Sequence, residues 1–198
     1  MPKFKPSLIL DRCPHCSVAN PNLSRLHLLE TKDHAGENKR MWGFYCCGRC
    51  GGIVTASALS EQHRVEEIFP DSRKVSDDIP ERARSYLAQA IASVHAPSGA
   101  VMLCASSVDA MLKHKQYSNG SLYQRIEKAV DDNLITSEMA NWAHDVRLDA
   151  NDERHADEAA TMPTEDDANR TIDFVTAFAE YLFVLPTKVK RGIKKDQS

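Results

Sequence analysis

The chain has 198 residues, of which 42% are hydrophobic and 27% are charged, and its net charge is −3. This length allows one or two small domains. The near-neutral charge excludes a global attraction to nucleic acid or to membranes, so such binding would need a local patch. No apolar run is long enough for a transmembrane helix or a secretory signal. We therefore expect a cytoplasmic protein without membrane association.

The first part of the chain is dominated by cysteine. Five of the six cysteines lie between residues 13 and 50, and the sixth, Cys104, lies on the apolar stripe of a predicted helix. Without a secretion signal, these residues are expected to be thiols rather than disulfides. Runs of bulky and β-branched residues at 7–10, 42–45 and 53–55 flank the cysteines and predict short strands. Residues 1–58 are therefore expected to form a small zinc-ribbon-like β domain.

Two Cys-x-x-Cys motifs give the strongest local signal. Each motif can place two thiolates on one tight turn, and two such turns together form the tetrahedral four-sulfur site that Zn²⁺ prefers. A closed four-thiolate site has no open coordination position. The zinc would thus be structural and would contribute folding energy to a domain with a small core. The predicted ligands are Cys13, Cys16, Cys47 and Cys50.

Alternatives remain open at this site. Either Cys46 or Cys47 could act together with Cys50, and the two-residue spacing favours Cys47, leaving Cys46 as a spare thiol. His15 could also be a ligand, although side chains inside such a turn usually point outward. A redox pair or unligated thiols are further possibilities, but a redox motif needs a thioredoxin-like βαβ context, which the sequence lacks.

The period of the sequence changes to helical after the cysteine region. Residues 59–79, with mixed charge and Pro70, are predicted to be a linker, and the basic residues 187–198 a disordered tail. Between them, residues 80–186 are expected to form an antiparallel bundle of about five helices, because the connections are short. The fold class is therefore mainly α. The helices are expected to start near Pro80, Pro97, Ser121, Thr136 and Thr164, with Leu87, Val108, Ile126, Trp142 and Phe178 in the core.

The fourth predicted helix carries a polar segment with catalytic potential. Arg147, Asn151 and His155 follow one another at one-turn spacing. The arginine could bind a phosphate, the histidine could act as a general acid or base, and the asparagine could hold either. Such a set suits metal-independent cleavage of RNA, in which the 2′-hydroxyl attacks the adjacent phosphate. The alternative is a solvated helix end in which Arg147 pairs with neighbouring aspartates.

The order of these motifs resembles the family called domain of unknown function 4145. The resemblance rests on CPxC and CxxCG, followed by IPERARSYLAQAI, GSLYQRIEKAVDDNLI, WAHDVRLDAND, RHAD and YLFVLP. Family members commonly have an arginine, a Gly-Asn pair and a histidine where this chain has Arg147, Ala150-Asn151 and His155.

This family looks like a branch of the higher-eukaryote-and-prokaryote nucleotide-binding (HEPN) helical superfamily. Many members of that superfamily are dimeric ribonucleases, toxins or antiviral effectors. The resemblance therefore implies an HEPN-like helical fold and a prokaryotic or phage setting with a defence or anti-defence role.

Two functions are compatible with the sequence. One is a non-catalytic zinc-containing interaction module that binds a protein partner or a second copy of the chain. The other is a metal-independent ribonuclease that acts on RNA. Seven residues separate Arg147 from His155, against four to six in the superfamily signature, and nine acidic residues lie between Asp145 and Asp167. Both features favour the interaction module. The spacing departs from the signature of the ribonucleases, and the acidic residues oppose phosphate binding, which needs positive charge.

Overall fold

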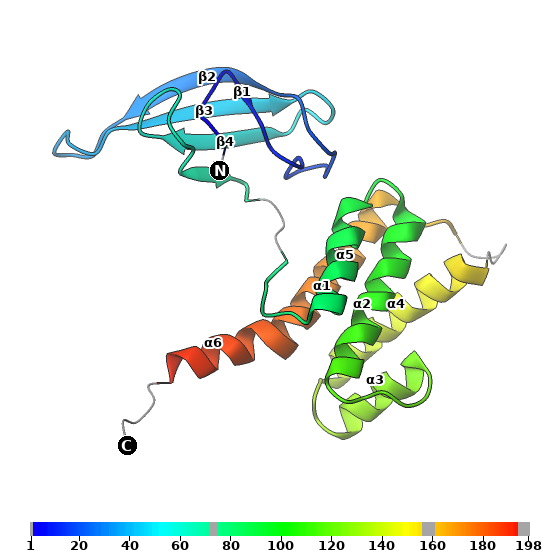
Figure 1. Cartoon of the computed structure of the whole chain (residues 1–198). Helices are drawn as coiled ribbons and strands as arrows, with labels where there is room; N and C mark the ends of the chain where they lie inside the picture. Colours follow the sequence, from blue (N-terminus) through cyan, green and yellow to red (C-terminus); the bar gives the residue numbers. More distant parts are fainter. Residues whose placement is uncertain (1, 72–74, 156–160, 194–198) are drawn as a thin grey trace. The chain divides into compact units, whose positions relative to one another are not determined.

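The computed structural model describes residues 2–71, 75–155 and 161–193. The chain divides into two compact units, Met1–Lys74 and Val75–Ser198. The first unit is a β-sheet and the second is helical, so the chain is mainly α with one antiparallel sheet (Figure 1). Within the described ranges, no helix is both long and apolar enough to cross a membrane.

The sheet is an antiparallel meander whose five strands pair in chain order. The pleat of β3 turns Gly43, Tyr45 and Cys47 toward the core and Trp42, Phe44 and Cys46 toward the other face. A bulge near Arg25 in β2 shifts its register against β3. The strands are β1 (Ser7–Leu8), β2 (Leu23–Thr31), β3 (Arg40–Cys47), β4 (Ile53–Ala58) and β5 (Glu67–Phe69).

Tyr45 lies at the centre of the sheet core. Its side chain is fully buried, and its hydroxyl donates a hydrogen bond to the carbonyl of Lys5 at 2.9 Å. Gly43 leaves the space for this ring, because a Cβ there would lie 2.7 Å from Tyr45 Cε2. The core also contains Phe4, Leu8, Cys13, Leu23, Cys47, Val54, Ala56, Ala58 and Val65.

The sheet continues beyond residue 58, where the sequence predicted a linker. Buried Val65 belongs to the sheet core, and β5 pairs with β4 through Thr55 and Phe69. This strand has only three residues and begins with a glutamate, so it shows too little alternation to be recognised. Within the predicted linker, residues 72–74 lie outside the described part of the chain.

The helical unit has α2 at its centre. This helix packs against α1, α3, α4 and α5. Each of the five helices begins within one residue of its expected start at Pro80, Pro97, Ser121, Thr136 or Thr164. The capping box of Ser121 and Gln124 is formed at the start of α3. Four of the expected core residues are buried, namely Leu87, Val108, Ile126 and Phe178. The helices are α1 (Glu81–Ala92), α2 (Pro97–His114), α3 (Leu122–Asp131), α4 (Ser137–His155) and α5 (Glu165–Ala179).

Trp142 was wrongly predicted to be a core residue. Its side chain is 43% exposed and stacks on Phe174, with ring centroids 4.5 Å apart. The core-facing side of α4 is formed by Ala143 and Val146 instead. Trp142 lies on the neighbouring side of the helix. Its large apolar ring favoured a core position in the sequence, but the helix turns that ring toward the surface.

The last helix does not end at Pro186. A π-helical turn, η1 (Glu180–Val184), follows α5, and α6 (Leu185–Gly192) continues the helix into the predicted basic tail. Pro186 follows η1 within one continuous helix, so its missing N–H falls next to the π-turn, where the α-helical hydrogen-bond pattern is already interrupted. Residues 194–198 of the predicted tail lie outside the described residues.

Candidate metal centre

The two Cys-x-x-Cys motifs form two turns with the same backbone hydrogen bonds. In the first turn, Ser17 N–H donates to the carbonyl of Cys13 at 3.0 Å, and Cys13 N–H donates to the carbonyl of Val18 at 3.0 Å. In the second turn, Gly51 N–H donates to the carbonyl of Cys47 at 2.9 Å, and Cys47 N–H to the carbonyl of Gly52 at 3.0 Å. The backbone of the first cysteine is therefore held by the same pair of hydrogen bonds in both turns.

Both turns need a left-handed backbone at the residue after the second cysteine. Ser17 has a φ of 56°, and Gly51 has a φ of 70°. Glycine adopts this conformation without strain, whereas serine does so at a cost. The common conformation turns the chain back so that the cysteine side chains converge.

The four sulfur atoms gather at one point. The Sγ atoms of Cys13, Cys16, Cys47 and Cys50 all lie within 4.8 Å of one another. Those of Cys13 and Cys50 are 3.9 Å apart. Sulfur atoms at the corners of a tetrahedron with Zn–S bonds of about 2.3 Å would be ~3.8 Å apart. The cluster therefore has the size of a four-thiolate metal site.

The position of Cys46 separates it from this cluster. Because neighbouring residues of a strand point to opposite faces, Cys47 is buried with the cluster while Cys46 lies on the other side of β3. The Cys46 thiol lies 3.8 Å from the carbonyl of Cys47 and does not belong to the group of four sulfur atoms.

The thiols differ in their electrostatic surroundings. Burial raises the pKa of Cys13, and burial raises the pKa of Cys16 to about 12. At Cys47, burial acts in the same direction, but hydrogen bonds from the backbone N–H groups of Cys50 and Arg49 bring its pKa down to about 7. The second turn thus supplies N–H groups to sulfur, including Gly52 N–H to Cys50 Sγ at 3.4 Å.

His15 links the first turn to the second. Its Nε2 lies 2.8 Å from the carbonyl oxygen of Ile53, and the ring does not belong to the group of four sulfur atoms. The ring also lies over Gly52, where a Cβ would come within 2.5 Å of His15 Cδ2. His15 therefore braces the centre, and Gly52 is required for the close approach of that ring.

The polar segment of α4 lies on one continuous helix. Arg147 and Asn151 are partly buried, whereas His155 is exposed at the end of the helix. The Arg147 guanidinium lies 5.5 Å from the centre of the Tyr123 ring, and its Nε has no hydrogen-bond partner among the described residues. With a rise of 1.5 Å per residue, Arg147 and His155 lie ~12 Å apart along the axis. Ala156 and Asp157, the end of the RHAD motif, lie outside the described residues.

Sequence reasoning missed the partners of this arginine on α3. Tyr123 stacks with His144 at a centroid distance of 4.8 Å, and His144 Nε2 lies 2.8 Å from Glu127 Oε1. His144 and Arg147 are three residues apart on α4, so both reach the same ring. The sequence could have indicated these contacts, because Tyr123 and Glu127 are four residues apart on one helix and His144 and Arg147 are three apart on the next.

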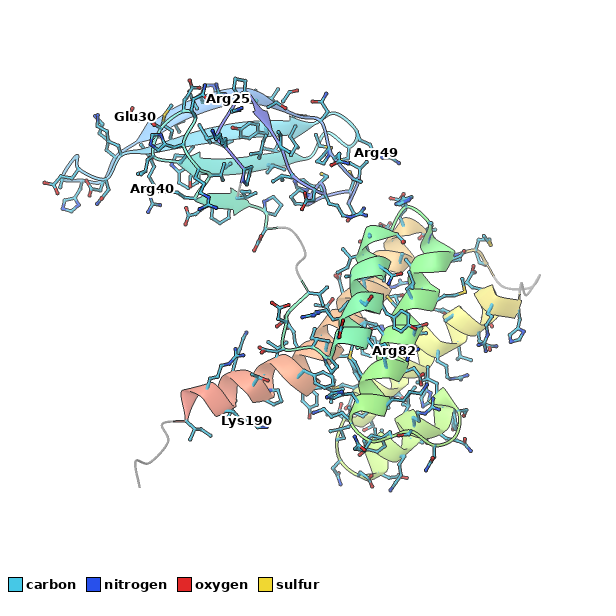
Figure 2. The ribbon with its side chains drawn as sticks, viewed as in Figure 1. Arg25, Glu30, Arg40, Arg49, Arg82 and Lys190 are labelled. Atoms are coloured by element: carbon cyan, nitrogen blue, oxygen red, sulfur yellow. The ribbon has the colours of Figure 1, made fainter. Side chains whose placement is uncertain are left out.

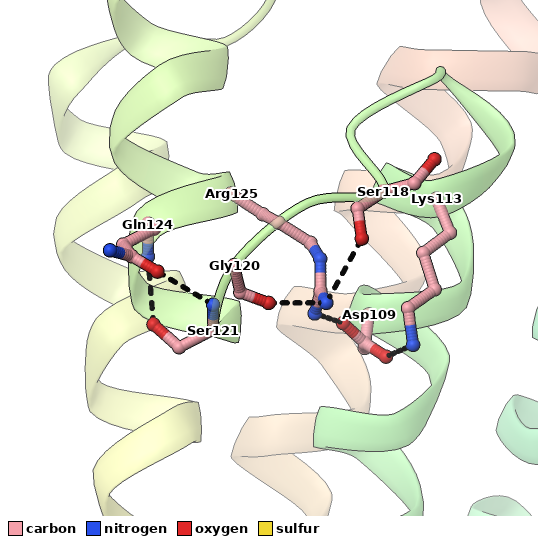
Figure 3. A network of polar contacts seen from close by, with 7 residues as sticks. All are labelled: Asp109, Lys113, Ser118, Gly120, Ser121, Gln124 and Arg125. Atoms are coloured by element: carbon pink, nitrogen blue, oxygen red, sulfur yellow. Dashed lines mark hydrogen bonds and ion pairs between the residues drawn. The ribbon is translucent and has the colours of Figure 1, made fainter.

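A second unpredicted feature connects α2 to the start of α3 (Figure 3). The Arg125 guanidinium contacts Asp109 at 2.5 Å and also donates to the carbonyls of Ser118 and Gly120 at 3.3 and 2.5 Å. Lys113 approaches the other oxygen of Asp109 at 2.5 Å. These contacts hold the loop before α3 in place. Asp109 contributes to them by pairing with the arginine that binds the loop carbonyls.

The helical unit is the part of the chain that matches a known family. A family model described as a domain of unknown function (DUF4145) matches residues 87–196, more than half of the chain. The match begins after the sheet, so both cysteine motifs lie outside it. No curated protein and no solved structure matches the chain.

Proposed function

The chain belongs to the DUF4145 family, and from this premise we propose that it is a zinc-containing interaction module without catalytic activity. In this proposal, a structural Zn²⁺ stabilises the sheet unit, and the helical unit, HEPN-like in fold, binds a protein partner in a prokaryotic or phage defence or anti-defence assembly. The observation that carries the proposal is the convergence of four thiols on one closed site.

The donor set supports zinc in a structural role. Four thiolates at tetrahedral spacing fill the coordination sphere of Zn²⁺, so no position remains for a water or a substrate. The thiols come from residues 13–16 and 47–50, which flank β2 and β3. A metal held there would join both ends of the sheet's central hairpin and would add its binding energy to the stability of the unit.

Metal analysis of matched variants tests this proposal. The purified chain should contain about one zinc per molecule. Cys47→Ser should lose the metal and Cys46→Ser, its immediate neighbour, should keep it. Iron in place of zinc would leave the four-sulfur site but overturn the choice of metal. Retention of metal in Cys47→Ser together with loss in Cys46→Ser would overturn the ligand assignment.

The charge of the helical unit supports the absence of RNA chemistry. Residues 75–198 contain fourteen Lys and Arg and twenty Asp and Glu, which gives a net charge of −6. A surface of this sign repels the phosphate backbone of RNA. The ~12 Å between Arg147 and His155 also exceeds what one phosphate can bridge without a second chain.

One observation favours the ribonuclease as a second candidate function. Arg147 has no carboxylate within ion-pair distance in the described ranges, and its Nε is buried without a hydrogen bond. An arginine in this state is available for a phosphate. In this alternative, two copies of the chain would bring Arg147, Asn151 and His155 together.

RNA cleavage by three variants separates the two candidates. A ribonuclease should lose about 10²–10⁴-fold in rate in His155→Ala while its melting temperature stays unchanged. Arg147→Lys should also impair a ribonuclease, because lysine lacks the planar two-pronged contact to phosphate. The interaction module should show no cleavage above background, and Asn151→Ala and Arg147→Lys should change stability alone. Cleavage by the wild-type chain that His155→Ala abolishes would contradict the module.

A further inference from the structure

Helix α6, together with η1 before it and the residue after it, carries an apolar stripe that the described residues of the helical unit leave exposed. None of the α6 residues is buried, and Figure 1 shows α6 continuing past the other helices. Apolar side chains recur every four residues, which keeps them on one side of the helix. They are Tyr181, Leu185, Val189 and Ile193, with exposed fractions of 42%, 53%, 53% and 65%.

Lysines flank this stripe on both sides. At about 100° per residue, Lys188 and Lys190 lie to either side of Val189, and Figure 2 shows Lys190 projecting from the helix. Neither lysine forms an ion pair within the described part of the chain, whereas Arg191, farther round the helix, contacts Asp78 at 2.6 Å. The outer side of α6 is therefore apolar at its centre and basic at its edges.

The outer side of α5 has the opposite charge. Asp166, Asp173 and Ala177 are exposed and follow one another at spacings of seven and four residues. Arg170, between them, is paired with Asp167 of the same helix. Because α5, η1 and α6 form one continuous helix, its exposed side is acidic in the first half, small at Ala177 and basic in the last half.

We propose that this side binds a second copy of the chain, with the two α5–α6 helices antiparallel and crossing near Ala177 and Tyr181. An antiparallel arrangement about a two-fold axis places the basic half of each helix against the acidic half of the other. Leu185 and Val189 are then covered at both ends of the interface, and Ala177 lets the two backbones approach at the crossing point.

The proposed interface deepens the proposed interaction role by naming a second copy as the partner of the helical unit. The same chain cannot provide the complementary half, since Lys190 lies 24 residues from Asp166 on one helix, or ~36 Å along the axis. The sheet unit is a poor match for α6, because residues 1–74 contain eleven Lys and Arg against eight Asp and Glu. The acidic half of α5 in a second copy provides the negative charge that the lysines of α6 need and is long enough to lie along that helix.

Sedimentation of the full chain with charge-reversal variants tests the interface. The wild-type chain should form a dimer whose dissociation constant rises with salt, because exposed charges are screened. Lys190→Glu should weaken the dimer ~tenfold or more, through like charges placed together. Adding Asp166→Lys to that variant should restore most of the lost affinity. A wild-type monomer across a hundredfold range of concentration would overturn the proposal, as would weakening that Asp166→Lys does not reverse.

A cross-link tests the position of the two-fold axis. Ala177→Cys should give a disulfide-linked dimer under mild oxidation, because residues near the axis face their own copies. Ala88→Cys, an exposed alanine on α1, is the matched control and should remain monomeric on a non-reducing gel. Equal cross-linking in both variants, or none in Ala177→Cys, would overturn this interface. Neither outcome bears on the zinc content, which tests the proposed function separately.

Discussion

Ser17 and Gly51 hold equivalent left-handed positions in the two cysteine turns, with φ values of 56° and 70°. Gly51→Ala should lower the stability of the sheet unit by about 1–2 kcal/mol, because a Cβ is strained there. Ser17→Gly should raise it by about 0.5 kcal/mol, since the relief of strain exceeds the added chain entropy. Urea unfolding followed by Trp42 fluorescence measures both, in a Trp142→Phe background. Ser17→Ala is the control and should stay near wild type, and a loss of stability in Ser17→Gly would contradict the argument.

Trp142 makes a smaller contribution to stability than a core tryptophan does. The ring is 43% exposed and keeps one stacking contact, with Phe174. Trp142→Ala should therefore lower the free energy of unfolding by about 1 kcal/mol. Phe178→Ala, at a fully buried position on α5, should cost about 3–5 kcal/mol. Thermal unfolding of the two variants side by side measures the difference, and equal losses would place Trp142 in the core.

At the scale of elements, Arg125 connects α2, the following loop and α3. Its side chain is 12% exposed and contacts Asp109 and two carbonyls, whereas the Lys113 side chain is 49% exposed. Arg125→Ala should lower stability by about 2–3 kcal/mol, because two carbonyls and one carboxylate lose a charged donor. Lys113→Ala should cost less than about 0.5 kcal/mol, as expected for a surface ion pair. Similar losses in chemical denaturation would show that the network does not depend on Arg125.

The acidic side of α4 gives the helical unit a dependence on pH. Loss of hydration and the nearby charges of Asp145, Asp152 and Asp167 raise the pKa of Asp149 above its ordinary value. A raised pKa means that the folded protein holds the proton more tightly, so this stabilising contribution is present at low pH and is lost as pH rises through the raised pKa. Ionised Asp149 therefore opposes folding at neutral pH.

Asp149→Asn should raise the melting temperature at pH 7, and the gain should shrink as the pH falls through the raised pKa of the wild-type carboxyl. Added salt should remove only part of the gain, because it screens the neighbouring aspartates but not the loss of hydration. Melting curves at several pH values and two salt concentrations measure both effects. A gain that is constant with pH would contradict this account.

At the scale of the whole molecule, the two units depend on different sources of stability. The sheet unit has a small core and the four-thiol site, whereas the helical unit has a large apolar core of its own. A strong zinc chelator should therefore unfold the sheet unit and leave the helical signal in far-ultraviolet circular dichroism largely intact. Trp42 emission should shift to the red on chelation. Loss of helix in parallel with that shift would show that the helical unit also needs the metal.

Much of this organisation follows from the sequence because its causes are local. Cys-x-x-Cys spacing predicted which thiols converge, and strand alternation explains why Cys47 joins them while Cys46 does not. The capping box at Ser121 marked the start of α3. The sequence failed where a choice depends on tertiary packing, as at Trp142, whose ring suits either a core or a surface. It also failed at β5, where three residues pair only because β4 is already in place.

The π-turn at Glu180–Val184 has a consequence for how such a chain can vary. A π-turn corresponds to one residue more than an α-helix needs. Deleting one residue within η1 would convert the π-turn into a regular α-turn and leave α6 nearly in phase with α5, because the turn already absorbs one residue more than an α-helix needs. Leu185 and Val189 would stay on the line that continues the exposed side of α5. A single-residue deletion in η1 thus preserves the outer surface of this helix, whereas the same deletion within α5 would turn all the following residues by ~100° about the helix axis.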